Sequence, residues 1–134
     1  MNKVYLAGQP NEYENSWKEL FKKLDGFDFY DWESDSDQTS PDTFFPADLC
    51  GIKKADFMVA NPGIAPSEGT WMEIGYFYAN NTKAPGDFCK KLIIVWREDR
   101  EPKWSIDFIK KAGWVVNSVE EAKNKLFEIA GEKQ

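Results

Sequence analysis

The chain has 134 residues, of which 42% are hydrophobic, and a formal net charge of -6, which is typical of one globular domain spanning residues 1–134. The net charge, with lysines scattered among acidic residues, argues against a nucleic-acid partner, because such proteins gather Lys and Arg on one face. The sequence has neither a signal-peptide pattern nor the ~18 apolar residues of a membrane span, so we expect no membrane partner, a cytoplasmic location and a small-molecule ligand.

Strand-like and helix-like segments alternate along the chain. The apolar runs predict strands at 4–7, 27–32, 57–60, 92–96 and 114–116, and the intervening patterns predict helices at 16–24, 44–53, 70–80, 106–112 and 119–130. This repeated β-α order predicts a five-stranded parallel sheet with helices on both faces. The best match is an α/β, flavodoxin-like three-layer sandwich with strand order 2-1-3-4-5. Two polar segments, 34–41 and 82–88, are expected to be irregular.

Cysteine and histidine content limits the possible chemistry. The chain has two cysteines, Cys50 and Cys89, and no histidine. The common zinc sites and the nucleophiles that depend on His are therefore excluded. We expect two reduced, structural thiols, no metal site and no cofactor.

The segment 48–76 has the layout of an active site. It begins with Asp48, continues through the short apolar strand 57–60 and turns at a loop rich in Pro and Gly. Glu73 follows in the first turns of the next helix. In open α/β sheets, ligands bind beyond the carboxyl ends of the strands, which is where this loop and Glu73 are expected.

Two interpretations of Glu73 are open from its spacing. A Ser or Thr followed three residues later by Glu is a capping-box pattern, which the sequence has at Ser16, Thr70 and Ser118. The Glu73 carboxylate could therefore cap the Thr70 amide. Alternatively, apolar neighbours such as Trp71 and Tyr76 could hold it in a pocket as a nucleophile.

Three segments together resemble a known family. They are KVYLAG at 3–8, DLCGIKKADFMVA at 48–60 and SEGTWMEIGYFYA at 67–79. In this order and spacing they resemble the nucleoside 2-deoxyribosyltransferases and the related 2'-deoxynucleoside 5'-monophosphate N-hydrolases. The resemblance covers roughly residues 3–96. It implies that Glu73 is the nucleophile and that Asp48 acts on the leaving base. It also favours a Tyr5 hydroxyl that reaches Glu73.

The chemistry of N-glycosidic cleavage suits these residues. Positive charge develops at the anomeric carbon, so an anionic oxygen such as that of Glu73 stabilises the transition state and can form a glycosyl-enzyme. The departing base leaves more readily when Asp48 donates a proton or a hydrogen bond. A second base that attacks the intermediate gives transfer, whereas water gives hydrolysis.

Further candidates surround these residues. Gly8 lets the backbone turn after the first strand, and Gln9 offers a polar group beside it. The predicted substrate-binding residues are Gly8, Gln9, Ser67, Gly69, Trp104 and Ser105. Asp56 is expected to be structural, through hydrogen bonds to backbone. Trp17, Trp32, Trp71, Trp96 and Trp104 could stack on a base, although core packing is the commoner role of such residues.

Four features bear on the substrate. Ser67 stands where typical transferases of this family have Asp and the hydrolase branch has Ser. The segment 9–12, Gln-Pro-Asn-Glu, lacks the Arg and Ser with which the hydrolase branch holds phosphate, and an acid near phosphate is unfavourable. In the family, a segment corresponding to 102–105 enters a neighbour's active site, and here it offers Ser105, as in hydrolases. The helix that ends the chain also resembles the hydrolases.

Our first interpretation is transfer of a deoxyribosyl group from a nucleoside to a free nucleobase. The alternative is an N-glycosidase that hydrolyses a nucleoside 5'-monophosphate, and a non-catalytic nucleotide-binding module is a further alternative. NAD cleavage has no support from a G-x-G-x-x-G fingerprint.

We also expect a homodimer or a larger homo-oligomer with shared active sites. Exposed aromatic residues would form the apolar centre of a two-fold interface, because such residues are enriched there. The expected interface residues are Trp71, Phe77, Trp104 and Phe108. The partner's segment around Ser105 would complete each site.

Overall fold

The computed structural model of the chain describes residues 1–9, 16–63, 67–97 and 105–132. The strands in these ranges are β1 (Asn2–Ala7), β2 (Phe27–Asp31), β3 (Phe57–Ala60), β4 (Leu92–Val95) and β5 (Trp114–Val116). The helices are α1 (Trp17–Lys22), α2 (Trp32–Asp35), α3 (Pro41–Lys54), α4 (Glu68–Asn80), α5 (Ser105–Ile109) and α6 (Val119–Ala130).

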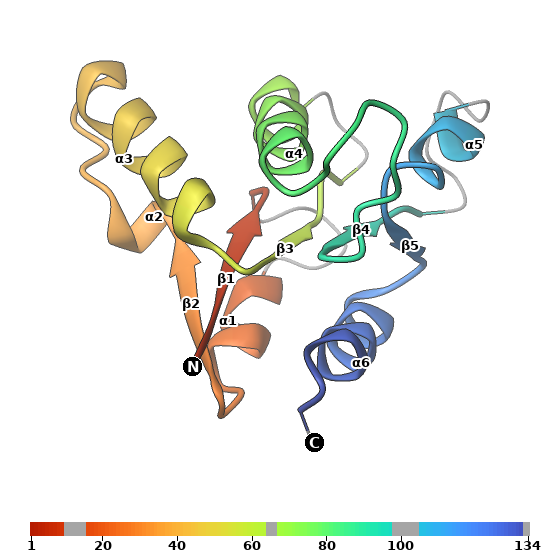
Figure 1. Cartoon of the computed structure of the whole chain (residues 1–134). Helices are drawn as coiled ribbons and strands as arrows, with labels where there is room; N and C mark the ends of the chain where they lie inside the picture. Colours follow the sequence, from red (N-terminus) through yellow and green to blue (C-terminus); the bar gives the residue numbers. More distant parts are fainter. Residues whose placement is uncertain (10–15, 64–66, 98–104, 133–134) are drawn as a thin grey trace.

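The strands form one parallel sheet in the order β2-β1-β3-β4-β5, which confirms the predicted topology. Helices α3, α4 and α5 cover one face, and α1 and α6 cover the other (Figure 1). Because successive side chains of a strand point to opposite faces, β1 contributes to both layers. Val4 and Leu6 pack toward α1 and α6, whereas Tyr5 and Ala7 pack toward α3 and α4.

The main differences from the predicted elements lie between β2 and α3. The expected irregular segment 34–41 is partly helical, because α2 begins directly after β2. The Asp31 side chain caps this short helix by accepting a hydrogen bond from the Glu33 N–H at 3.1 Å. Helix α3 begins at Pro41, three residues before the predicted start, since Pro is favoured at the first helical position.

The helix start before Glu73 also differs from the prediction. Helix α4 begins at Glu68, and Thr70 lies inside the helix as a buried residue. Thr70 and Glu73 therefore do not form a capping box. Ser118 does cap its helix, by accepting a hydrogen bond from the Glu121 N–H at 3.1 Å. The Ser16 side chain makes no cap hydrogen bond.

Asp56 has the structural role that was predicted for it. Its Oδ2 accepts a hydrogen bond from the Lys3 N–H at 2.8 Å, and its own N–H donates to the Lys3 carbonyl at 2.7 Å. These two hydrogen bonds join the start of β3 to the start of β1. They lie at the end of the sheet opposite the loop that connects β3 to α4. Both cysteines are free thiols.

Two further observations concern the described ranges alone. None of the helices there combines the length and apolar character that a bilayer span requires. The same residues contain no group of three Cys, Asp or Glu side chains placed to hold a metal ion.

Candidate active site

The side chains of Tyr5 and Glu73 meet on the face of the sheet covered by α3 and α4. Tyr5 lies in β1 and is completely buried, and Glu73 lies in the second turn of α4. The Tyr5 hydroxyl donates a hydrogen bond to Glu73 Oε2 at 2.5 Å. This is the contact that was expected from the sequence. It fixes the direction of the carboxylate, because a buried strand residue has little freedom to move.

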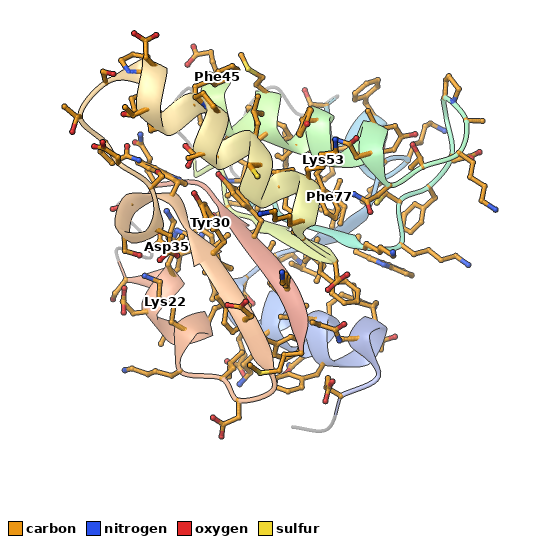
Figure 2. All side chains as sticks on the ribbon, turned by 60° about the vertical axis from the view of Figure 1, so that its left-hand side comes forward. Lys22, Tyr30, Asp35, Phe45, Lys53 and Phe77 are labelled. Carbon is orange, nitrogen blue, oxygen red and sulfur yellow. The ribbon has the colours of Figure 1, made fainter. Side chains whose placement is uncertain are left out.

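Asp48 is brought into the same region by α3. Its side chain is buried, and its Oδ1 accepts a hydrogen bond from the Tyr30 hydroxyl at 3.3 Å. Tyr30 belongs to β2 (Figure 2), and its ring lies against Gly51 of α3. The negative charge of Asp48 raises the pKa of both Tyr5 and Glu73, so the three groups lie close together. The structure thus brings together the three residues predicted to be catalytic.

Burial raises the pKa of both carboxyl groups. The pKa of Glu73 is raised to about 7, mainly because burial disfavours its charged form, and the Asp48 charge adds to this. The Tyr5 hydrogen bond opposes that rise. Burial also raises the pKa of Asp48, against hydrogen bonds from Ser36 and Tyr30. Near neutral pH, Glu73 is therefore close to balance between a nucleophilic carboxylate and a carboxylic acid.

This shift predicts a pH-dependent gain in stability for Glu73→Gln. A folded-state pKa of about 7 against an ordinary 4.5 means that folding favours the protonated form. The wild type should therefore lose stability as the pH rises from about 4.5 to about 7, by up to about 3 kcal/mol. The variant lacks this loss, so its advantage in urea unfolding should be larger at pH 8 than at pH 4.

The matched control is Glu68→Gln, which changes an exposed glutamate of the same helix. It should change stability by a similar amount at both pH values. If the free energy of unfolding depends on pH in the same way in the wild type and in Glu73→Gln, the pKa of Glu73 is not raised in the folded protein.

The turn after β1 is held tightly. Gly8 has a positive φ of 131°, and a Cβ atom at this position would lie 2.4 Å from the Asn61 carbonyl oxygen. A side chain is therefore excluded here. The Trp32 indole N–H donates to the Gly8 carbonyl at 3.2 Å, and the Trp17 indole N–H donates to the Gln9 carbonyl at 3.1 Å. These bonds fix the backbone beside the predicted substrate site.

The structure narrows the choice of tryptophans that could stack on a base. Trp17 and Trp96 are 1% and 5% exposed and belong to the core, so they are not available for stacking. Trp32 and Trp71 are half-buried. Trp71 packs edge-on against Trp96 with ring centroids 6.2 Å apart. Trp104 lies outside the described residues.

Sequence reasoning missed a buried lysine near the site. Lys18 of α1 is 5% exposed, and its Nζ lies 3.0 Å from Asp31 Oδ1 and 2.9 Å from Glu33 Oε1. The same ammonium group lies 4.5 Å from the centre of the Trp32 ring. Its positive charge opposes the rise in pKa of both predicted catalytic carboxyl groups. An acid at the end of a predicted strand, Asp31, was the only sequence signal for this pairing.

The start of α4 contains two of the predicted substrate-binding residues, Ser67 at the N-cap and Gly69 in the first turn. The Ser67 Oγ is buried without a hydrogen-bond partner among the described residues. A buried hydroxyl of this kind usually has a partner, so it is suited to bind a ligand group. Gly69 is exposed, and a Cβ atom there would meet nothing within 4 Å. Close packing in the described part of the chain therefore does not require glycine at this position.

The predicted interface residues fall into different environments. Phe77 is completely buried against the sheet, so its prediction as an interface residue was wrong. It lies three residues after Ile74 on the inward face of α4, which is the spacing of a core stripe. Phe108 is 70% exposed. Ser105 begins α5, on the β5 side of the sheet and away from β1 (Figure 1). A homo-oligomer in which a neighbour supplies Ser105 stays a prediction.

Comparisons with known proteins add the following. No family model matches the chain, and no curated protein matches it. The structure of the CMP N-glycosidase BcmB from Clostridium botulinum is similar, with 25% identity, a TM-score of 0.62 and coverage of 93% of this chain and 98% of that one. The solution structure of BlsM is also similar, with 23% identity, a TM-score of 0.61 and coverage of 96% and 88%. Both likenesses support a nucleoside 2-deoxyribosyltransferase-like fold.

Proposed function

We propose that the protein is an N-glycosidase that hydrolyses a nucleoside 5'-monophosphate. The observation that carries this proposal is the hydrogen bond between the Tyr5 hydroxyl and Glu73, with Asp48 beside them. This arrangement has the two carboxyl groups that cleavage of a glycosidic bond requires. The similar structure of BcmB, a CMP N-glycosidase, supports a nucleotide substrate and hydrolysis. It thus favours the alternative from the sequence over transfer.

The first step of the proposed reaction forms a glycosyl-enzyme. A carboxylate oxygen of Glu73 attacks the anomeric carbon while the bond from that carbon to the base nitrogen breaks. The bonding electrons leave with the base, and Asp48 donates a proton or hydrogen bond to it. Tyr5 binds Oε2, so we assign the attack to Oε1. In the second step, water attacks the anomeric carbon and gives its proton to the Asp48 carboxylate, while the bond from that carbon to Glu73 breaks. This releases the sugar phosphate and regenerates the Glu73 carboxylate and the Asp48 acid.

Tyr5 has two effects in this scheme. Its hydrogen bond stabilises the ionised Glu73 against the cost of burial, so more of the nucleophilic form is present near neutral pH. Burial next to Glu73 also raises the pKa of Tyr5 itself far above its ordinary value. The hydroxyl therefore stays protonated and remains a hydrogen-bond donor.

Transfer to a second base remains a candidate because of one sequence observation. The segment 9–12 lacks the Arg and Ser that the resemblance implies for binding phosphate. A free nucleoside would not need them. Transfer uses the same glycosyl-Glu73 intermediate, and only the acceptor differs.

Product analysis distinguishes these reactions. The protein is incubated with ribo- and deoxynucleoside 5'-monophosphates, CMP included, and with the matching nucleosides, each with and without a second base. We expect chromatography to show free base and sugar phosphate from a monophosphate, independent of the second base. A new nucleoside that requires the second base would instead establish transfer.

The control for this experiment is Glu73→Gln, which should form neither product. If the wild type binds a nucleotide but cleaves none of the substrates, the enzyme assignment is wrong. The non-catalytic nucleotide-binding module would then be the better description.

A further inference from the structure

Two stacked tyrosines connect the two carboxyl groups of the site. Tyr5 and Tyr30 are direct partners in the pairing of β1 with β2, so their side chains leave the same face of the sheet. Their ring centroids lie 5.3 Å apart, with 16° between the ring planes. The Tyr5 hydroxyl donates to Glu73. The Tyr30 hydroxyl lies 3.3 Å from Asp48 Oδ1 and 3.4 Å from the Ala47 carbonyl oxygen, so it can donate to either residue of α3. Because the two rings are stacked, a shift of one ring would change the distance between the Glu73 and Asp48 carboxyl groups.

Helix α3 closes the other side of the Tyr30 ring. A Cβ atom at Gly51 would lie 3.1 Å from Cε1 and 3.1 Å from Cζ of this ring. Because the ring already stacks on Tyr5, it has little room to move away from such an atom. Asp48 lies three residues before Gly51 on α3, and residues at this spacing share one face of a helix. The face of α3 that carries Asp48 therefore also contacts the Tyr30 ring, through Gly51.

We propose that Tyr30 is a positioning residue whose hydroxyl holds the Asp48 carboxyl group in place for the departing base. Gly51 contributes to this positioning, because the absence of a side chain there leaves room for the Tyr30 ring between Tyr5 and α3. The role in base departure rests on the proposed function. The contact itself does not.

The surrounding charges set the direction of the expected effects. The titratable or charged groups that influence Asp48 or Tyr30, besides each other, are Tyr5 of β1, Lys18 of α1, Asp35 of α2 and Glu73 of α4. The pKa of Tyr30 is raised to about 12, first by burial and then by the Asp48 charge, so its hydroxyl remains a donor at neutral pH. Its hydrogen bond favours the ionised form of Asp48. Removal of the hydroxyl should therefore raise the pKa of Asp48.

Tyr30→Phe tests the proposal while keeping the stacked ring. If Asp48 acts in its protonated form, activity is lost as the pH rises through its pKa. The variant should move this alkaline loss to higher pH and lower turnover by roughly tenfold, the scale of one hydrogen bond to a charged group. The matched control is Tyr78→Phe, which removes a hydroxyl bonded to the Asp87 carbonyl after α4. It should change neither property.

A second measurement is independent of activity. The ¹³C signal of the Asp48 carboxyl group is titrated by NMR in the wild type and in Tyr30→Phe. A higher Asp48 pKa in the variant is expected. An unchanged titration would overturn the inference, even in an active enzyme. The Asp48 pKa could be raised in Tyr30→Phe while the wild type cleaves no substrate. That result would refute the proposed function and the role in base departure, but it would still support the contact between Tyr30 and Asp48.

Gly51→Ala tests the same contact from the helix side. The added methyl group should displace the Tyr30 ring and reproduce the higher Asp48 pKa with the hydroxyl still present. The matched control is Gly75→Ala in α4, where a Cβ atom would meet nothing within 4 Å. If the Asp48 pKa in Gly51→Ala equals that of the wild type, Gly51 does not help to position Tyr30 and Asp48.

Discussion

Replacement of Glu73 by Gln is expected to lower turnover by at least about 10³-fold and to leave the fold intact, because a nucleophile within a working group of residues is lost. The amide keeps nearly the size of the carboxylate and can still accept a hydrogen bond from the Tyr5 hydroxyl. It cannot form the glycosyl ester or stabilise the positive anomeric carbon as an anion does. The measurement is turnover of the nucleotide that the wild type cleaves.

The control for this loss is Glu68→Gln, which removes an exposed carboxylate from the first turn of the same helix. It should keep most of the activity. Turnover of Glu73→Gln close to that of the wild type would refute Glu73 as the nucleophile.

Asp48→Asn is expected to slow cleavage of poor leaving groups by about 10²- to 10⁴-fold, the usual contribution of a general acid. Activated leaving groups should be affected much less, since they depart without a proton. Burial raises the pKa of the Asp48 carboxyl group, which favours the protonated form that an acid needs. The measurement compares turnover for a series of bases of different acidity.

The matched control is Asp42→Asn, an exposed acid in the first turn of α3. It should leave the dependence on the leaving group unchanged. If Asp48→Asn slows all leaving groups equally, Asp48 has a structural role instead.

The fold was predictable because two of its inner strands, β3 and β4, are unbroken apolar runs. Residues 57–60 and 92–95 are buried on both faces of the sheet and have no polar interruption. The short helix α2 was missed because its four residues, Trp-Glu-Ser-Asp, are too few to show a helical period. Its cap depends on Asp31 at the end of a strand, which a local pattern does not distinguish from a turn residue.

The site was predictable only in part. The contact between Tyr5 and Glu73 was expected from the resemblance and from the ends of neighbouring elements. The roles of Tyr30 and Lys18 were missed, because they depend on the pairing of β1 with β2 and on the packing of α1 and α3. Such contacts join residues distant in the sequence, and no local spacing indicates them.

The central claim, a glycosyl-Glu73 intermediate, is tested most directly by the stereochemistry of the product. The wild-type protein is given its nucleotide substrate in water containing methanol, and the configuration of the methyl glycoside is determined by NMR. Two displacements at the anomeric carbon restore the original configuration, so the account predicts the β product. Formation of the α product would mean direct attack by the acceptor, and it would contradict a covalent intermediate on Glu73.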